Sequence, residues 1–239
     1  TVSLCTLGQD RYKIRAGDPN GINKWYMGRQ IAHVMSHYGI DWLEREEREM
    51  EENTTLLLKN LAVKPGMVVA DIGAGSGYHS ALLSKMVGMG KVFAVDVGYG
   101  QLAWELQQDP RVVSLERTNF RHLEFERLGE TVDLVVIDVS FISLRLIFPK
   151  ALEFLKPGGT LLALVKPQFE AGAAEVGKRG KVSDTAVHER VLEALKDKAQ
   201  ELGFLVSGQT KSAIVGKKSG NVEFFLWLKK SPKFDSIAS

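Results

Sequence analysis

A glycine-rich segment, DIGAGSG, lies between a short apolar run and an amphipathic stretch. Residues without a Cβ let the backbone approach a ligand closely, and glycine patterns in such a strand–loop–helix setting bind cofactors. An acid ends the next apolar run, where a carboxylate can accept both hydroxyls of a ribose. The positions concerned are Asp71, Gly73, Gly75, Gly77 and Asp96. The pattern predicts a cofactor that contains a ribose; a tight turn without a ligand is the alternative.

A lysine follows a second apolar run, LLALV (161–165). The run is apolar throughout rather than alternating, which predicts a strand buried on both faces. Pro167 cannot donate to a sheet ladder, so the strand should end near Lys166. Ligands of open α/β sheets bind at the carboxyl ends of the strands. Lys166 is therefore a candidate for chemistry, provided that the chain builds such a sheet.

Elements that would build this sheet alternate along the chain. Short apolar runs predict strands at 68–72, 92–95, 112–115, 134–138, 161–165, 205–210 and 222–228. Amphipathic patterns predict helices at 78–87, 100–108, 144–155 and 187–202. Alternating strands and helices that end in a β-hairpin predict an α/β fold with a seven-stranded, mostly parallel sheet.

The first part of the chain has no strand pattern. We expect residues 1–60 to form a helical extension, with helices near 27–38 and 44–60, before a main domain at 61–231 and a tail at 232–239. His33 and His37 are one helical turn apart, which suits a metal ion, but no third ligand accompanies them. We therefore predict no metal site.

The composition is that of a globular protein. With 239 residues, of which 44% are hydrophobic, the chain can form one large domain with an appendage. The net charge of +2 neither requires nor excludes a nucleic acid partner. A single cysteine, Cys5, excludes an intramolecular disulfide and fits a reducing compartment. No apolar stretch is long enough to span a membrane, so we expect a cytoplasmic protein without membrane insertion.

The glycine loop together with Asp96 resembles that of class I S-adenosylmethionine (SAM) methyltransferases, which implies a Rossmann-like fold and SAM as the cofactor. From about residue 95 to 229 the chain is similar to the TlyA (hemolysin A) family, relatives of the FtsJ-like ribosomal RNA 2′-O-methyltransferases. The matching phrases are DVGYGQLAW, DPRVVSLERTNFR, DLVVIDVSFISL, LVKPQFEAG and GNVEFFLWL. Residues 11 to about 95 resemble a different group of bacterial methyltransferases, so we interpret the chain as a chimera with its seam at Asp96.

This resemblance implies roles for further residues. Asp138, Lys166 and Glu223 correspond to three members of a catalytic set around a ribose hydroxyl, with Lys166 as the base. A lysine with a depressed pKa is suited to this role. The family's first catalytic lysine is missing, because Glu52 and Asn53 stand in its place within an acidic run.

Other residues are assigned to the cofactor and the substrate. Asp138 also belongs to the cofactor site, and Thr118 and Asn119 are expected to face the adenine, with helix capping as the alternative. A long glycine-spaced loop at 170–183 holds candidates for phosphate contacts, with solvated charge as the alternative. These candidates are Lys178, Arg179 and Lys181.

The predicted function is SAM-dependent methyl transfer to a ribose 2′-hydroxyl of ribosomal RNA. Two alternatives stay open. The enzyme could methylate a small molecule, or the missing lysine could leave a SAM-binding domain with little turnover.

Overall fold

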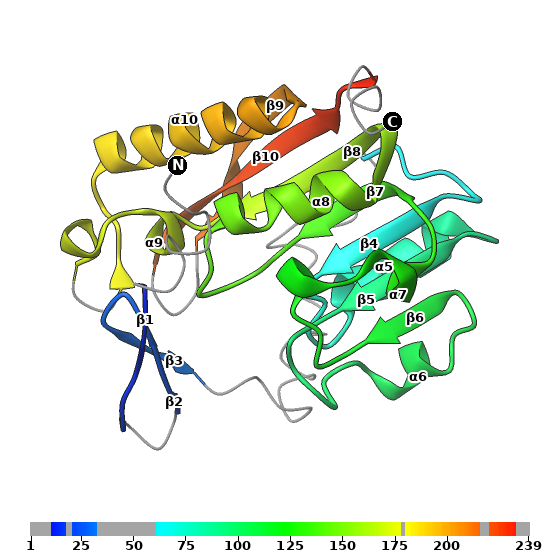
Figure 1. Ribbon diagram of the computed structural model, residues 1–239, viewed down its shortest axis with the longest axis horizontal. Coiled ribbons are helices and arrows are strands. Elements are labelled where there is room, and N and C mark those ends of the chain that lie inside the picture. The colour runs from blue at the N-terminus through cyan, green and yellow to red at the C-terminus, as the bar shows by residue number, and fades with distance from the viewer. Residues whose placement is uncertain (1–10, 18–20, 33–60, 178–179, 216–219, 233–239) are drawn as a thin grey trace.

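The computed structural model describes residues 11–17, 21–32, 61–177, 180–215 and 220–232. Two β-sheets form within these residues (Figure 1). The larger sheet has seven strands in the order β6-β5-β4-β7-β8-β10-β9. Its strands are β4 (Val68–Ile72), β5 (Lys91–Val95), β6 (Val112–Leu115), β7 (Val132–Ile137), β8 (Leu155–Val165), β9 (Phe204–Val215) and β10 (Val222–Lys230).

The strand directions confirm the predicted architecture. Strands β4 to β8 pair in parallel, whereas β10 runs antiparallel to both β8 and β9. The chain starts the sheet at β4, extends it on one side with β5 and β6, and then crosses to the other side with β7. Ligands of doubly wound sheets bind where the strand order reverses. The sheet is thus the Rossmann-like class I methyltransferase fold, with its crevice expected beyond the carboxyl ends of β4, β5 and β7.

Helices cover both faces of this sheet. The pair α5 (Tyr78–Val87) and α6 (Trp104–Gln107) packs on one face, and α8 (Phe148–Phe154) and α10 (Thr185–Leu202) pack on the other. Side chains of neighbouring strand residues therefore enter different cores, as with Val69 and Ala70 of β4. Burial on both faces explains why the strands are continuously apolar in sequence.

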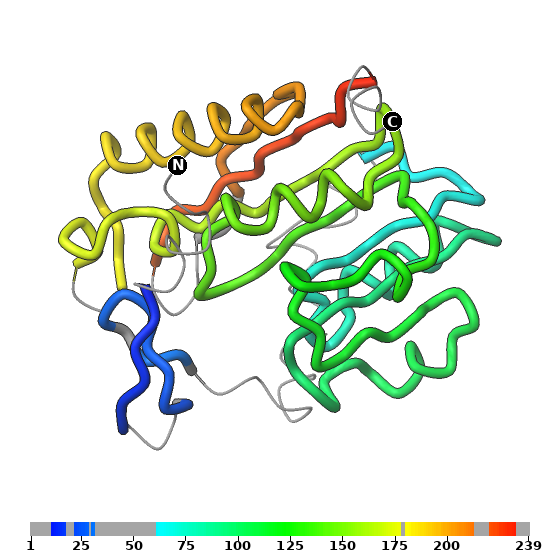
Figure 2. The backbone as a smooth tube through the Cα atoms, in the orientation of Figure 1, coloured from blue at the N-terminus to red at the C-terminus, as the bar shows by residue number. Residues whose placement is uncertain are grey.

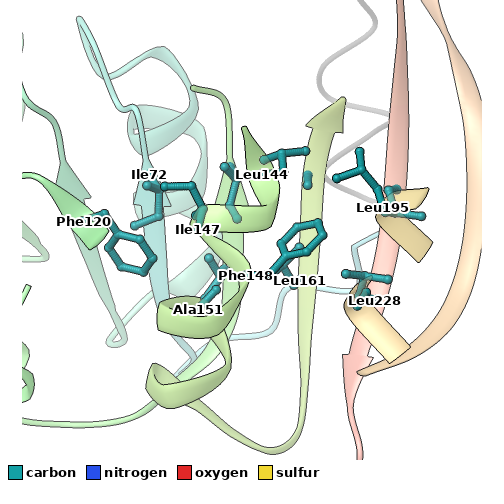
Figure 3. Close-up of a cluster of buried hydrophobic side chains, with 14 of the residues drawn as sticks. Ile72, Phe120, Leu144, Ile147, Phe148, Ala151, Leu161, Leu195 and Leu228 are labelled. Carbon is teal, nitrogen blue, oxygen red and sulfur yellow. The ribbon is translucent and has the colours of Figure 1, made fainter. Parts of the chain in front are cut away.

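Figure 3 shows the larger core, where Phe148 of α8 lies beside Leu161 of β8. Helix α10 buries one apolar stripe, and Asp184 begins the helix because its side chain accepts a hydrogen bond from the Ala186 amide at 2.9 Å. Helix α8 is shorter than expected because Pro149 lies in its first turn, and the residues before it form a separate turn. The remaining short elements are α7 (Phe125–Leu128), α9 (Pro167–Glu170), η2 (Phe120–His122), η3 (Leu144–Leu146) and η4 (Ala173–Glu175).

The expected helical extension is wrong for the part of the N-terminal region that the structure describes. A three-stranded antiparallel sheet forms there, with strands β1 (Tyr12–Ile14), β2 (Gly21–Tyr26) and β3 (Arg29–Ala32). Met27 and Gly28 both have positive φ angles and join β2 to β3 as a tight hairpin turn, where a helix was expected to begin. The predicted acidic helix at 44–60 lies outside the described residues, as do His33 and His37.

None of the described helices is both long and apolar enough to cross a membrane. Within the same residues, no group of three or more potential metal ligands comes together.

Candidate active site

The glycine loop joins β4 to α5 and crosses the end of the neighbouring strands. Gly73 donates from its amide to the Val95 carbonyl at 2.8 Å, and its φ of +85° lies in the left-handed region. A Cβ at Gly73 would lie 2.1 Å from the Asp138 carbonyl oxygen, whereas a Cβ at Gly75 would meet nothing within 4 Å. Gly73 therefore allows the loop to contact β7, and Gly75 borders open space that a ligand can occupy.

Asp96 follows β5 and ties two loops together. One of its carboxylate oxygens accepts the Gly75 amide at 2.9 Å, and the other accepts the Gly98 amide at 2.7 Å. Each oxygen keeps a further lone pair, and the side chain is only partly buried. The carboxylate is therefore oriented by the backbone and still able to accept two hydroxyl groups.

Asp71 lies near the end of β4, just before the glycine loop, and links this strand to α5. It is 0% exposed, and its Oδ2 accepts a hydrogen bond from the Ser80 hydroxyl at 2.7 Å. Burial raises the pKa of its carboxyl group, and its Oδ1 has no hydrogen-bond partner among the described residues.

Three other predicted cofactor residues have structural contacts. A Cβ at Gly77 would lie 2.3 Å from the Leu106 side chain, so this glycine allows close packing against α6. Thr118 is buried, and its hydroxyl donates to the Glu116 carbonyl at 2.9 Å. Asn119 caps η2 by accepting the Arg121 amide at 3.2 Å, which is the alternative considered for it. Contact of Thr118 and Asn119 with an adenine stays a prediction.

The proposed catalytic residues come from three adjacent strands and lie together. Lys166 follows β8, and its Nζ is 2.5 Å from Oδ1 of Asp138, which follows β7. The same Nζ lies 3.1 Å from the Ser140 hydroxyl, a contact that the sequence did not suggest. Strand pairing of Phe224 with Val165 brings buried Glu223 opposite Lys166 at the next position.

The pKa of Lys166 is raised, whereas a depressed pKa was expected. Burial lowers the pKa of its ammonium group, but the ion pair and hydrogen bond with Asp138 and the negative charge of Glu223 together raise it above the ordinary lysine value. The predicted depressed pKa is therefore wrong for the protein without a ligand. Two nearby carboxylates stabilise the charged form more than burial destabilises it.

The loop after β8 is anchored next to this cluster. Asn221, which is fully buried, accepts the Val182 amide at 2.9 Å and donates to the Gly180 carbonyl at 2.9 Å. Lys181 is exposed and its Nζ lies near Gly220, whereas Lys178 and Arg179 lie outside the described residues. Asn221 was not singled out from the sequence; an amide directly before the apolar run at 222–228 was the available signal.

Comparison with known proteins gives a family match over most of the chain. The model of FtsJ-like methyltransferases matches residues 52–230. The 16S/23S rRNA (cytidine-2'-O)-methyltransferase TlyA of Mycobacterium tuberculosis is 48% identical over 160 residues, which are 66% of this chain and 59% of the relative. Hemolysin A of Brachyspira hyodysenteriae is 37% identical over 158 residues, 66% of this chain and 65% of the relative. The chain thus matches less than two thirds of the length of these relatives.

Solved structures agree with this match. A structure from Streptococcus thermophilus has a TM-score of 0.70 at 38% identity and covers 87% of this chain and 70% of its own. A structure from Lactococcus lactis has a TM-score of 0.71 at 39% identity and covers 80% of this chain and 91% of its own. The family match runs through residue 95 without a break. The interpretation of the chain as a chimera with a seam at Asp96 is therefore not borne out.

Proposed function

The chain belongs to the FtsJ-like methyltransferase family, and we propose that it transfers the methyl group of SAM to a ribose 2′-hydroxyl of ribosomal RNA. The observation that carries the proposal is the ion pair of Lys166 and Asp138, with Glu223 opposite, at the sheet edge where the glycine loop lies. The name of the tuberculosis relative specifies this reaction on ribosomal RNA, which favours RNA over a small molecule. Because ribosomal RNA is the proposed substrate, the proposal places the protein's activity in the cytoplasm.

The residues at the sheet edge fit SAM. Open space beside Gly75 admits a ligand against the loop backbone, and the Asp96 carboxylate has spare lone pairs for two ribose hydroxyls. Asp138 borders the same loop through Gly73. When bound, SAM supplies an electrophilic methyl group on a positively charged sulfonium.

Lys166 is the proposed acceptor of the substrate proton. A ribose hydroxyl is a poor nucleophile until its proton has an acceptor, and Nζ of Lys166 would take that proton as the oxygen attacks. Because the Lys166 pKa is raised, Nζ must first release a proton of its own. That proton goes to solvent, because a carboxylate is a weaker base than an amine and Asp138, at 2.5 Å, stabilises the ammonium form. A neighbouring positive charge would favour this release.

A domain that binds SAM with little turnover is the second candidate. The observation that favours it is the presence of Glu52 and Asn53 where the family's first catalytic lysine is expected; both lie outside the described residues. The two candidates share the cofactor site and differ in turnover.

The deciding experiment is incubation of the protein with labelled SAM and ribosomal subunits. We expect label in RNA, located as 2′-O-methylribose by nuclease digestion and mass spectrometry. A methyl group on a base nitrogen or carbon would contradict the 2′-hydroxyl mechanism. Binding of S-adenosylhomocysteine without any labelled RNA would favour the second candidate.

Asp96→Ala should weaken binding of S-adenosylhomocysteine by about 10–100-fold, since a hydrogen bond to a charged acceptor contributes about 1.5–3 kcal/mol. Isothermal titration calorimetry measures the affinity. Asp109→Ala is the matched control, because that carboxylate pairs with Arg111 before β6, away from the carboxyl ends of the strands. Equal affinity of Asp96→Ala and the parent would exclude Asp96 from the cofactor site.

A further inference from the structure

We infer that the β1–β2 strand pair is a clamp on the two loops that carry Asp138 and Lys166, and that the hydroxyls of Tyr12 and Tyr26 are its positioning groups. The catalytic part of this inference depends on the proposed function. The structural part, that the two hydroxyls hold the two loops, does not.

Each tyrosine bonds to one of the two loops. The Tyr12 hydroxyl donates to the Phe141 carbonyl at 2.7 Å, and Phe141 lies three residues after Asp138. The Tyr26 hydroxyl donates to the Phe169 carbonyl at 2.6 Å, at the equivalent position three residues after Lys166. The contacts join segments far apart in the sequence, and Figure 2 shows the blue N-terminal strands beside the segment that follows β8.

Strand pairing sets the separation of the two hydroxyls. Tyr12 and Tyr26 are direct partners in the β1–β2 ladder, so their side chains lie on the same face. Their ring centroids are 5.1 Å apart, and those of Phe141 and Phe169 are 4.9 Å apart. Tyr26 also contacts the Phe169 ring and is only 1% exposed. Two rigid rings on one strand pair thus face two rings on the catalytic loops.

Both loops gain from external support, in addition to the bonds that Ser143 and Leu144 donate to Glu170 at 2.6 and 2.7 Å. Phe141 has a φ of +59°, a left-handed conformation that is strained for a residue with a Cβ. Lys166 is the N-cap of α9, a helix of only four residues, and a single turn has little stability of its own. The Tyr12 bond holds the strained residue Phe141 in one loop. The Tyr26 bond holds Phe169 in the single helical turn of the other.

The hydrogen bond from the Tyr12 hydroxyl should persist at neutral pH. Burial, followed by the neighbouring Tyr26, raises the pKa of Tyr12 to about 12. Its hydroxyl therefore stays protonated and able to donate. Arg11 donates to the Tyr26 oxygen at 3.2 Å, which leaves the Tyr26 proton for the Phe169 carbonyl.

Removal of either hydroxyl should leave the strand pair attached to one loop only. The two loops still touch through the Lys166–Asp138 ion pair and through Glu170, so their relative position should shift rather than be lost. Reaction rates are sensitive to displacements of about 1 Å in catalytic groups, so the relative position of Asp138 and Lys166 affects turnover. The glycine loop makes none of these contacts. The inference therefore predicts a loss in kcat without a loss in cofactor affinity.

The test uses Tyr12→Phe, Tyr26→Phe and the double variant, which keep both rings. We expect kcat to fall about 10-fold in each single variant, with KM for ribosomal subunits and S-adenosylhomocysteine affinity within about 2-fold of the parent. The double variant should lose no more than about 10-fold, because either change alone already leaves the strand pair attached to only one loop. Losses that multiply to about 100-fold would overturn a shared clamp.

Hydrogen exchange of the free protein tests the clamp without any turnover. The amides of Leu144 and Ala171 in the two loops should exchange about 10-fold faster in both tyrosine variants. Trp25→Phe is the matched control, because it removes the Nε1 bond to the Arg15 carbonyl within the same small sheet, and neighbouring strand residues such as Trp25 and Tyr26 point to opposite faces. Unchanged exchange in Tyr26→Phe would overturn the clamp. If the parent methylates no RNA, the proposed function fails, while this measurement still decides the clamp.

Discussion

Lys166→Ala should lower the rate of methyl transfer to ribosomal RNA by about 10²–10⁴-fold, because the ribose hydroxyl would lose its proton acceptor. The affinity for S-adenosylhomocysteine should change little, since Asp96 and the glycine loop are unaffected. Single-turnover methyl transfer measures the rate, and calorimetry measures the affinity.

The chain offers a matched control on the same strand. Lys156 lies at the opposite end of β8 and is ion-paired with Asp133 at 2.8 Å, much as Lys166 is paired with Asp138. Lys156→Ala should leave methyl transfer close to that of the parent. If Lys166→Ala were as active as Lys156→Ala, Lys166 would not be the base.

The pH dependence of the parent follows from the same group. Asp138 and Glu223 hold the pKa of Lys166 above its ordinary value despite burial, so the ammonium form dominates at neutral pH in the protein without a ligand. Only the neutral amine accepts a proton. The rate should therefore rise with pH, about tenfold per unit below the pKa, and Lys166→Ala should lose this dependence.

Two alanine substitutions in the glycine loop should destabilise the fold to different extents. Gly73→Ala should destabilise the fold by about 2–5 kcal/mol, because a left-handed φ is unfavourable for alanine and the new Cβ would overlap the Asp138 carbonyl. Gly75→Ala has no neighbour to displace, so it should lose only about 1–2 kcal/mol. Urea denaturation measures both values.

The affinity for S-adenosylhomocysteine completes this comparison. The Cβ of Gly75→Ala would occupy the open space beside the loop, so binding should weaken at least about 10-fold in a protein that remains folded. A Gly75→Ala protein that binds as tightly as the parent would show that the ligand does not approach this backbone. A Gly73→Ala protein as stable as the parent would contradict the contact with β7.

The sheet was predictable because its signals are local. Strands β4 and β6 begin and end at the expected residues, 68–72 and 112–115, since each is a short, mostly apolar run that ends before a glycine or a charged residue. Burial on both faces requires such runs, and a strand of this kind has few other environments. The same locality applies to the glycine loop, whose conformation requires residues without a Cβ.

The small N-terminal sheet was not predictable from these signals. Its strands are short, and several of their side chains are exposed, so the sequence has no apolar alternation to detect. The turn between β2 and β3 requires a positive φ at Met27, which is uncommon for a residue with a Cβ. Contacts of Tyr12 and Tyr26 with distant carbonyls stabilise this sheet, and no local pattern encodes them.

The sequence by itself determined which side chains end the strands, and therefore that Asp96, Asp138 and Lys166 share one edge of a parallel sheet. Chain direction and strand order suffice for that conclusion. The charge of Lys166 was decided only by the tertiary structure, because it depends on the balance between burial and two carboxylates. Those carboxylates come from other strands, and their distances from the amine are set by packing rather than by spacing along the chain.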